Sequence, residues 1–487
     1  MAQLLTGQFI AGGDGIQLSS DGRFIEAPSG DRLPVKNPVT QAVMGTLHIY
    51  SPADIDAAVD RARLAVSAWS DRPLSERAAL LHRWADRIHA DAQPLADVLM
   101  DEIAKNAQDA LDEVHRSADY IHYTAEEALR LHGEALLSDA FPGQRRNKIS
   151  LTSRVPVGVV LAIPPFNYPI NLAVTKIAPA LMMGNTVIVK PPTQGAFSGL
   201  NIIALAYDSG IPTDALIPVI GPGSTTGDVL VRHQFINLVS FTGSSETGAH
   251  IAQQVKMVPL QLELGGKDAA LVLPDADINR AADHIVSGAF AYSGQRCTAV
   301  KRVLALASVA DLLNPALVER VERLTVGTPS ENAIITPLIS MASADYVWDL
   351  VDEAVQQGAK PLTPLQRDGS LIYPIILDHV ELSMRIAWEE PFGPVLPIIR
   401  VSSVPDAIEV ANRSEYGLQA ALFTKDIAQA IQIAEKLDVG TVQINGKTSR
   451  GPDHFPFVGT KASGMGAQGV RHSLLAMSRV KSVVLNL

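Results

Sequence analysis

The spacing of apolar positions predicts helices in the first third of the chain. Short apolar alternations among Gly, Asp and Pro residues up to about residue 50 predict strands and turns. Ser51-Pro52-Ala53-Asp54 then supplies an N-cap residue, a proline at the first helical position and an early acid. Apolar residues follow at helical spacing, at Ile55, Val59, Ala62, Val66 and Trp69. We therefore expect a helix here, a second over about residues 75–90 and a third over about residues 94–132.

From residue 155 the pattern changes to short strands that alternate with helices. Apolar, β-branched runs predict strands at 157–163, 186–190, 216–220 and 236–241. Helices are expected between and after them, at 172–183, 199–207, 225–233 and 247–255. This alternation indicates an α/β fold with a parallel sheet covered on both faces. Strand-like runs at 269–273, 303–307 and 395–399 continue the α/β pattern to about residue 440. The architecture is of a nucleotide-binding type, but a fold alone does not define the chemistry.

The composition narrows the possible partners. The chain has 487 residues, 47% of them hydrophobic and 19% charged, so it can bury a large core in about three lobes. Its net charge of −11 disfavours nucleic acid or an anionic membrane as a partner. A basic cluster at 144–154 lacks aromatic residues and is more typical of a solvated hairpin than of a nucleic-acid arm. The uncharged window at 155–175 contains four prolines, which disfavours a membrane span. Since no basic residue precedes Arg23, we expect no targeting signal and a cytoplasmic protein.

Several common catalytic motifs are absent from the sequence. There is no His-Glu-x-x-His, and a single cysteine excludes both a disulfide framework and a multi-cysteine zinc site, so no metal is expected. There is also no Gly-x-Ser-x-Gly elbow of a serine hydrolase. The segment Gly243-Ser-Ser-Glu-Thr-Gly248 has the glycine spacing of a P-loop, but Ala249-His250 replaces the required Lys and Ser/Thr. An NTPase is therefore disfavoured.

Three segments offer a nucleophile, a base and an oxyanion donor. The one thiol, Cys297, lies in Tyr292-Ser-Gly-Gln-Arg-Cys297, where we expect the adjacent Arg296 to favour the reactive thiolate. Glu263 lies between two leucines and before two glycines, and a carboxylate in apolar surroundings has the raised pKa of a general base. Asn167 follows the strand at 157–163, where open α/β sheets bind ligands, and its amide can donate to an oxyanion.

These segments, with Phe241-Thr-Gly243 and Trp388-Glu-Glu-Pro-Phe-Gly-Pro394, resemble the aldehyde dehydrogenase superfamily over essentially the whole chain. Within it, Asn167-Tyr168, Lys190-Pro-Pro-Thr-Gln194 and the Cys297 segment are similar to the NADP-dependent non-phosphorylating glyceraldehyde-3-phosphate dehydrogenases. The resemblance implies a Rossmann-type cofactor domain at 1–140 and 155–262 and an α/β catalytic domain at 263–440. A small β oligomerisation element at 141–154 and 441–487 is implied too, and with it a homotetramer.

The resemblance also implies a mechanism. The Cys297 thiolate attacks an aldehyde, and the oxyanion is held by the Asn167 amide and the Cys297 backbone N–H. Hydride transfer to the nicotinamide leaves a thioester, which a water activated by Glu263 hydrolyses. The implied reaction is the irreversible oxidation of D-glyceraldehyde 3-phosphate to 3-phosphoglycerate.

The expected cofactor is NADP. NAD enzymes place an acid near the end of the second strand to bind the ribose 2′-hydroxyl, but the first acid after residue 190 is Asp208, a helix away. Lys190 and Thr193 offer a cation and a donor there, which suit a 2′-phosphate. By resemblance the cofactor site also includes Asp228, Gly243, Ser244, Gly248, Glu390 and Phe392. Pro164 replaces a serine that these relatives usually carry, so one hydroxyl contact to the cofactor is lost.

A phosphorylated aldehyde needs a local cationic site in this acidic protein. The phosphate-binding positions of the resembled enzymes correspond to Arg116, Tyr168, Arg296 and Arg450, and Asn167 and Thr298 complete the implied substrate site. One alternative is the NADP-dependent oxidation of another small anionic aldehyde, such as a semialdehyde. A non-catalytic nucleotide-binding protein is a remote alternative, because the expected nucleophile, base and oxyanion donor are all present.

Overall fold

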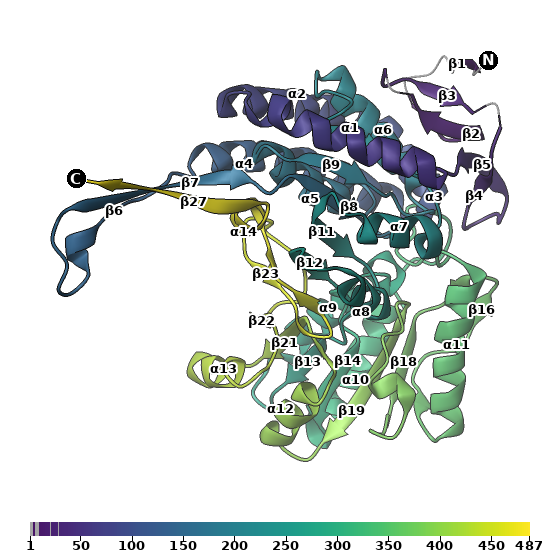
Figure 1. The fold of residues 1–487 in the computed structure, drawn as a ribbon. Helices are drawn as coiled ribbons and strands as arrows, with labels where there is room; N and C mark the ends of the chain where they lie inside the picture. Colours follow the sequence, from purple (N-terminus) through teal and green to yellow (C-terminus); the bar gives the residue numbers. More distant parts are fainter. Residues whose placement is uncertain (1–2, 5–8, 20, 28) are drawn as a thin grey trace.

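The computed structural model describes residues 3–4, 9–19, 21–27 and 29–487, so the first residues of the expected cofactor domain lie outside the described residues. Two α/β halves meet at the middle of the molecule (Figure 1). The strands of the first sheet lie in the order β10 (Leu216–Pro218), β9 (Thr186–Val189), β8 (Val159–Ile163), β11 (Ile236–Thr242), β12 (Leu260–Glu263) and β25 (Gly464–Met465). Neighbouring strands are parallel except at β25. The chain leaves β8 toward β9 and later returns to its other side at β11, so the strand order reverses between β8 and β11.

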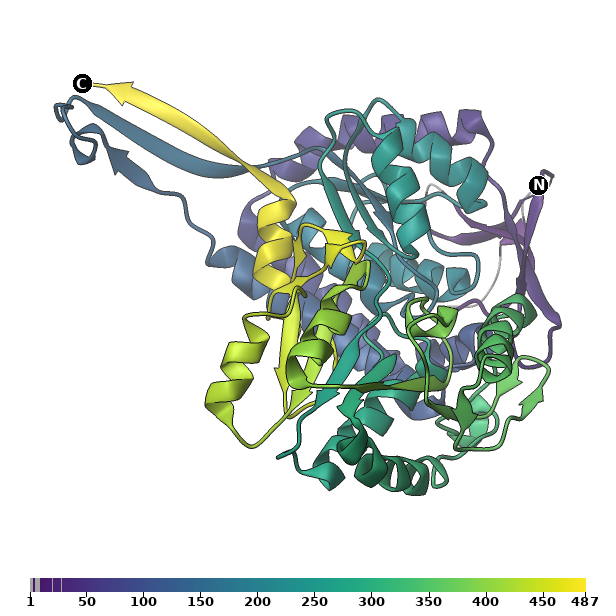
Figure 2. The same cartoon turned by 90° about the horizontal axis from the view of Figure 1, so that it is seen from below.

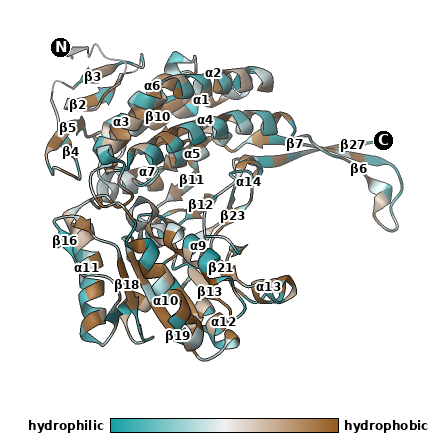
Figure 3. Ribbon diagram, turned by 180° about the vertical axis from the view of Figure 1, so that it is seen from behind, coloured by the Kyte–Doolittle hydropathy of each residue, from teal (hydrophilic) through white to brown (hydrophobic). Residues whose placement is uncertain are grey.

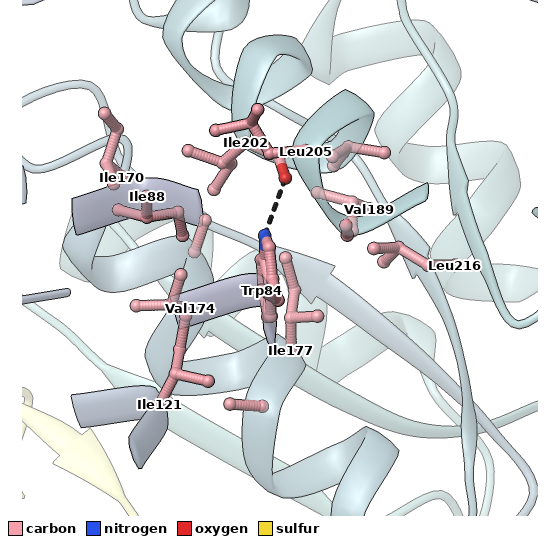
Figure 4. Close-up of a cluster of buried hydrophobic side chains, with 14 of the residues drawn as sticks. Trp84, Ile88, Ile121, Ile170, Val174, Ile177, Val189, Ile202, Leu205 and Leu216 are labelled. Carbon is pink, nitrogen blue, oxygen red and sulfur yellow. Dashed lines mark hydrogen bonds between the residues drawn. The ribbon is translucent and has the colours of Figure 1, made fainter. Parts of the chain in front are cut away.

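Helices cover both faces of this sheet, as the buried strands require. They are α1 (Pro52–Ser70), α5 (Asn171–Met182), α6 (Ala196–Asp208), α7 (Asp228–Arg232) and α8 (Ser245–Gln254). The expected capping of α1 is confirmed, because the Ser51 side chain accepts from the Asp54 N–H in a capping box. Trp84 is fully buried against α5 and α6, and its indole N–H donates to the Ile202 carbonyl at 2.8 Å (Figure 4).

An outer helical layer is formed by α2 (Leu74–Ala90), α3 (Ala92–Ile103) and α4 (Ala107–Leu129). The prediction of a single helix over 94–132 is therefore wrong. The chain breaks at Ala104, which adopts a left-handed conformation with φ of 53°. Asn106 then caps α4 by accepting from the Asp109 N–H, and this local side-chain bond competes with a continuous helix.

The second sheet has the strand order β15 (Lys360–Pro361), β18 (Ile375–Asp378), β19 (Val395–Val401), β14 (Arg302–Leu306), β13 (Ala269–Val272), β21 (Gln419–Phe423) and β22 (Thr441–Ile444). Its helices are α9 (Ile278–Phe290), α10 (Ala307–Val321), α11 (Met341–Gln356), α12 (Val404–Asn412) and α13 (Ile427–Ala434). Separate hydrophobic clusters fill its two faces. Hydrophobic residues gather in the strands and on the helix faces turned toward them (Figure 3).

Two further β elements flank this frame. At the N-terminal end, β1 (Gln3–Leu4), β3 (Phe24–Glu26), β2 (Gly13–Leu18), β5 (Val43–His48) and β4 (Arg32–Lys36) form a sheet that packs against the helical layer. At the other end, β6 (Ala135–Leu137), β7 (Lys148–Pro156) and β27 (Ser478–Asn486) form an antiparallel arm that projects from the body (Figure 2). The remaining short elements are α14 (Val470–Ala476), β16 (Arg367–Asp368), β17 (Leu371–Ile372), β20 (Tyr416–Gly417), β23 (Phe457–Val458), β24 (Thr460–Lys461) and β26 (Ala467–Gln468). Within the described ranges, no helix is long and apolar enough to cross a membrane.

Candidate active site

A cavity of about 810 Å³ opens at the carboxyl ends of β8 and β11, where the strand order of the first sheet reverses. Open α/β sheets bind ligands at this position. Its lining comes from both halves of the molecule. The first half contributes Asn167, Lys190, Asp228, Gly243 and Ser244, and the second contributes Cys297, Glu390 and Phe392. Eight of the residues expected from the sequence are thus brought together in one cavity.

The backbone before Cys297 is tightly constrained. Tyr292, Ser293 and Gly294 have φ values of 50°, 51° and 71°. A Cβ at Gly294 would lie 2.3 Å from the Gly393 carbonyl oxygen, so only glycine fits this turn. The turn brings the Cys297 Sγ to 3.8 Å from the Glu263 Oε1. The expected nucleophile and the expected base therefore face each other.

The surroundings of Cys297 favour the protonated thiol. Burial, and secondly the Glu263 carboxylate, raise the pKa of Cys297 to about 12. The raised pKa runs against the expectation that the adjacent Arg296 favours the thiolate, and the Arg296 guanidinium Nη2 donates to the Gly288 carbonyl. Activation of the thiol thus depends on proton transfer to a base rather than on a neighbouring arginine.

Glu263 is 3% exposed, but its surroundings are not apolar as expected. Its Oε2 accepts from Arg450 Nη1 at 2.8 Å and from the Thr242 hydroxyl at 3.1 Å. Lys176 in turn donates to Thr242 Oγ1 at 2.7 Å, and burial lowers the pKa of this lysine to about 7. Sequence reasoning missed Lys176 and Thr242, although Lys176 is the one charged residue of the otherwise uncharged helix α5. An ion-paired network, rather than desolvation alone, surrounds the expected base.

Asn167 is buried beside the Cys297 segment. Its Nδ2 donates to the Gln295 carbonyl at 2.9 Å, two residues before Cys297. Its backbone carbonyl accepts from Lys105 Nζ at 2.7 Å. The amide therefore points to the turn that carries the thiol, as an oxyanion donor must.

Lys190 presents a buried cation to the cavity. It is 5% exposed, and its ammonium group donates to the Pro191 carbonyl at 3.2 Å. No carboxylate of the described residues lies within ion-pair distance of it, and burial lowers its pKa to about 8. A buried cation without a counter-ion suits an anionic ligand group, and the cavity is large enough for a dinucleotide. The residues here therefore fit a phosphorylated nucleotide.

The other residues expected around the cofactor have different roles. Gly243 and Ser244 lie at the start of α8, where Ser244 caps the helix by accepting from the Thr247 N–H at 3.2 Å. Asp228 lines the cavity and is bonded to His250 at 2.9 Å. Gly248 permits close packing, because a Cβ there would meet the Leu264 side chain at 2.5 Å. Gly248 and Thr193 are not among the cavity-lining residues. We call Lys190, Asp228, Gly243 and Ser244 the Lys190 side.

Glu390 is held in place across the cavity. Lys301 forms an ion pair with Glu390 at 2.8 Å and also donates to the Cys297 carbonyl at 2.5 Å. One lysine, which sequence reasoning missed although it follows Cys297 by four residues, therefore links this carboxylate to the nucleophile segment. Phe392 packs edge-to-face against Phe166, with ring centroids 5.9 Å apart.

The residues expected to bind phosphate do not line this cavity, and Arg450 connects them to the site through Glu263. Arg116 forms a two-pronged ion pair with Asp453, at 2.6 and 2.7 Å, and also donates to the Arg450 carbonyl at 3.1 Å. Arg450 Nε lies 3.7 Å from Asp453, while Nη1 contacts Glu263. Burial raises the pKa of Tyr168 to about 12, against the opposing fields of Arg296 and Arg116. We call Arg116, Arg296 and Arg450, with Tyr168, the arginine cluster.

Arg296 is the member of this cluster without a carboxylate partner. It is 8% exposed, and its Nε has no hydrogen-bond partner in the described part of the chain. A buried guanidinium with an unsatisfied donor suits an anionic ligand. The neighbouring Thr298 is buried, and its carbonyl accepts from the Thr448 hydroxyl at 2.8 Å. Asp453 was missed, because an aspartate after Gly-Pro is typical of an ordinary turn.

Fold and cavity together define an aldehyde-oxidising class, and the chain belongs to the aldehyde dehydrogenase family, whose model matches residues 24–483. It is 48% identical to the NADP-dependent glyceraldehyde-3-phosphate dehydrogenase of Arabidopsis thaliana, over 99% of this chain and 98% of that protein. It is 49% identical to the protein of the same name from Streptococcus equinus, over 94% of this chain and 96% of that protein. The expected family and α/β fold are therefore confirmed.

A solved structure shows the same fold in detail. The crystal structure of NADP-dependent glyceraldehyde-3-phosphate dehydrogenase from Bacillus halodurans C-125 complexed with NADP is 49% identical to this chain. The TM-score is 0.95, and the match covers 98% of this chain and 99% of that one.

Proposed function

We propose that this protein oxidises D-glyceraldehyde 3-phosphate to 3-phosphoglycerate and reduces NADP. The observation that carries the proposal is the Cys297–Glu263 pair at 3.8 Å, set between the buried Lys190 and the arginine cluster. The pair supplies a nucleophile and a base, and the two sides supply one cationic site for each phosphorylated reactant. Relatives at 48–49% identity carry the corresponding name.

In the acylation half, Glu263 Oε1 accepts the Cys297 proton, and the thiolate attacks the aldehyde carbon. The Asn167 amide and the Cys297 backbone N–H hold the oxyanion that forms. NADP, when bound, supplies the ring that accepts the hydride. Arg296 and Arg116 hold the substrate phosphate and thereby orient the carbonyl over the thiol. The product on the protein is a thioester of Cys297.

Glu263 passes the proton taken from Cys297 to solvent before the deacylation half, and then accepts a proton from a water that attacks the thioester carbonyl. Asn167 stabilises the second oxyanion in the same way as the first. The Cys297 sulfur leaves and regains a proton, and the carboxylic acid ionises at neutral pH. Because the thiolate does not attack that carboxylate again, the overall oxidation is irreversible.

Lys190 and Thr193 are proposed to hold the 2′-phosphate of NADP, with Asp228, Gly243, Ser244 and Gly248 around the rest of the nucleotide. Glu390 would bind the nicotinamide ribose beside Phe392. Residues 1–140 and 155–262 form the cofactor domain and residues 263–440 the catalytic domain in this proposal. We further propose a cytoplasmic homotetramer that assembles through 141–154 and 441–487. In support, β7 and β27 expose the apolar residues Leu151, Val480, Val483, Val484 and Leu485.

The test is an NADPH-forming assay with glyceraldehyde 3-phosphate, with and without inorganic phosphate. We expect phosphate-independent reduction of NADP, and a strict phosphate requirement would contradict hydrolysis by water. Succinic semialdehyde in parallel distinguishes the phosphorylated aldehyde from another small anionic one. Arg296→Ala should raise KM for glyceraldehyde 3-phosphate by about 10²-fold and should affect the uncharged glyceraldehyde much less, because Arg296 is not paired with the base Glu263.

A further inference from the structure

Lys105 and Glu113 form an ion pair that the proposed mechanism does not use. Both side chains are completely buried, at 0% exposure, and the Lys105 ammonium group donates directly to Glu113 Oε2. Lys105 precedes α4, and Glu113 lies within that helix. Moving two charges out of water is costly unless further hydrogen bonds satisfy them. In this structure, further hydrogen bonds satisfy both members of the pair.

The pair anchors the segment that carries Asn167 at both of its ends. Lys105 Nζ donates to the Asn167 carbonyl at 2.7 Å. Glu113 Oε1 accepts from the Ile170 and Asn171 backbone N–H groups, at 3.0 Å each. A carboxylate at the start of α5 satisfies N–H groups that the helix itself leaves unpaired. The path of the chain from Asn167 to Asn171 is thus fixed by one buried charge at each end.

Lys105 also contacts the rings of two tyrosines beside the thiol. Its Nζ lies 3.6 Å from the ring centroid of Tyr168 and 4.6 Å from that of Tyr292. The two rings pack edge-to-face, and Tyr292 begins the constrained turn that leads to Cys297. A desolvated cation over an aromatic face is among the stronger interactions of this type. Burial lowers the pKa of Lys105, while the Glu113 carboxylate opposes that shift.

We propose that the Lys105–Glu113 pair positions the Asn167 amide and the Tyr168 ring for attack by Cys297. Its loss then slows acylation without weakening NADP binding. This inference rests on the proposed oxidation through a Cys297 thioester. Neither residue is proposed to touch the substrate, so both are positioning residues.

The test uses Lys105→Met/Glu113→Gln, because removal of one partner would leave an uncompensated buried charge. The double variant is neutral, similar in volume, and keeps an acceptor for the α5 N–H groups. Stopped-flow formation of NADPH from glyceraldehyde 3-phosphate should show a burst about 10²-fold slower than in the wild type, the usual cost of a misplaced oxyanion donor. The dissociation constant of NADP, measured by fluorescence titration, should not change.

Glu102→Gln is the matched control. Glu102 is likewise completely buried and caps α6 by accepting from the Phe197 and Ser198 N–H groups, at 2.8 and 2.9 Å. At saturating NADP its burst should match the wild type. If the double variant does not fold, Glu113→Asp provides the test, because it keeps the charge pair but draws the carboxylate back from the Ile170 and Asn171 N–H groups, and we expect its burst to be about tenfold slower. A folded variant with a wild-type rate of NADPH formation in the first turnover would overturn the inference, whereas a wild-type protein that forms no NADPH from glyceraldehyde 3-phosphate would instead overturn the proposed function.

Discussion

The Lys190 side and the arginine cluster neutralise their buried cations in different ways. On the Lys190 side the ammonium group contacts a carbonyl and no carboxylate of the described residues. In the arginine cluster Arg116 and Arg450 are already paired, with Asp453 and with Glu263. A nucleotide phosphate can therefore bind at Lys190 without displacing a protein anion. A substrate phosphate at the cluster must share guanidinium groups with internal carboxylates, one of which is the expected base.

This difference separates binding from chemistry. On the first side Lys190 has no carboxylate partner among the described residues, which favours affinity and selectivity for an additional phosphate. In the arginine cluster, internal carboxylates already balance the charge of Arg116 and Arg450, so a substrate anion gains less free energy on binding there. Arg450, however, links a bound anion to Glu263. Only Arg296 in the cluster lacks a carboxylate partner among the described residues, so it is the site where a substrate anion gains most.

Of the variants considered, we expect the greatest loss of activity from replacing Glu263, the carboxylate that Arg450 contacts. Glu263→Gln keeps the shape and an acceptor for Arg450 but removes the base that faces Cys297. Steady-state formation of NADPH should fall by about 10²–10⁴-fold, the usual contribution of a general base. Circular dichroism and NADP titration serve as controls for the fold. Steady-state turnover near the wild-type value would show that Glu263 has only a structural role in the ion pair.

The second prediction concerns the thiol between the two sides. Because the pKa of Cys297 is raised to about 12, the thiolate is disfavoured at neutral pH and its fraction grows with rising pH. Alkylation of the ligand-free protein by iodoacetamide should accelerate about tenfold per pH unit from pH 7 to 9, without a plateau. Cys297 is the single cysteine, so labelling reports one site, and Cys297→Ala gives the background. A plateau below pH 9 would mean that the cluster, rather than Glu263, dominates the charge around the sulfur.

The sequence predicts much of the fold and some positions of the candidate site. The strand–helix alternation from residue 155 predicts β8, β9, β10 and β11 of the first sheet, because the pattern depends on local burial, but it does not predict β12 or β25. The break at Ala104 was missed because the apolar periodicity continues across it. The helix is nevertheless interrupted there, and Asn106 caps the start of the next helix, α4. Asn167 and Glu263 lie just after β8 and at the end of β12, where open α/β sheets bind ligands, whereas Cys297 lies on the turn that follows α9.

The charge pairs of the site could not be predicted in the same way. Arg450 and Glu263 are 187 positions apart, and Arg116 and Asp453 are 337 apart. No local pattern indicates which arginine contacts which acid over such distances. The apolar neighbours Leu262 and Leu264 suggested a desolvated carboxylate, but they point away from the charge that Arg450 and Thr242 supply. The expected effect of Arg296 on Cys297 and the expected apolar surroundings of Glu263 both run against the structure for this reason: contacts between residues far apart in the sequence decide the charge at these positions.

The third prediction concerns Lys190 and the preference for NADP over NAD. Lys190→Ala removes the one cation that we expect at the 2′-phosphate, so the preference for NADP over NAD in kcat/KM should fall by about tenfold or more. KM for glyceraldehyde 3-phosphate should stay unchanged, because the arginine cluster is intact. Lys436→Ala, at an exposed position just after α13, is a matched control for the loss of a lysine. An unchanged cofactor preference would assign the selectivity to other residues.

The last prediction asks whether the Asp453 carboxylate competes with the substrate phosphate, and it concerns a modest change in KM. Asp453→Asn keeps an oxygen acceptor for Arg116 but removes a negative charge from beside two cluster arginines. If the carboxylate competes with a phosphate dianion, KM for glyceraldehyde 3-phosphate should fall by about threefold, in keeping with the modest worth of a partly exposed ion pair. The kinetics with uncharged glyceraldehyde should not change. A KM that rises instead would show that Asp453 chiefly orients Arg116, because the loss of a rigid partner would then outweigh the loss of repulsion. In that case the internal pairing of the cluster would be preorganisation for the substrate anion rather than competition with it.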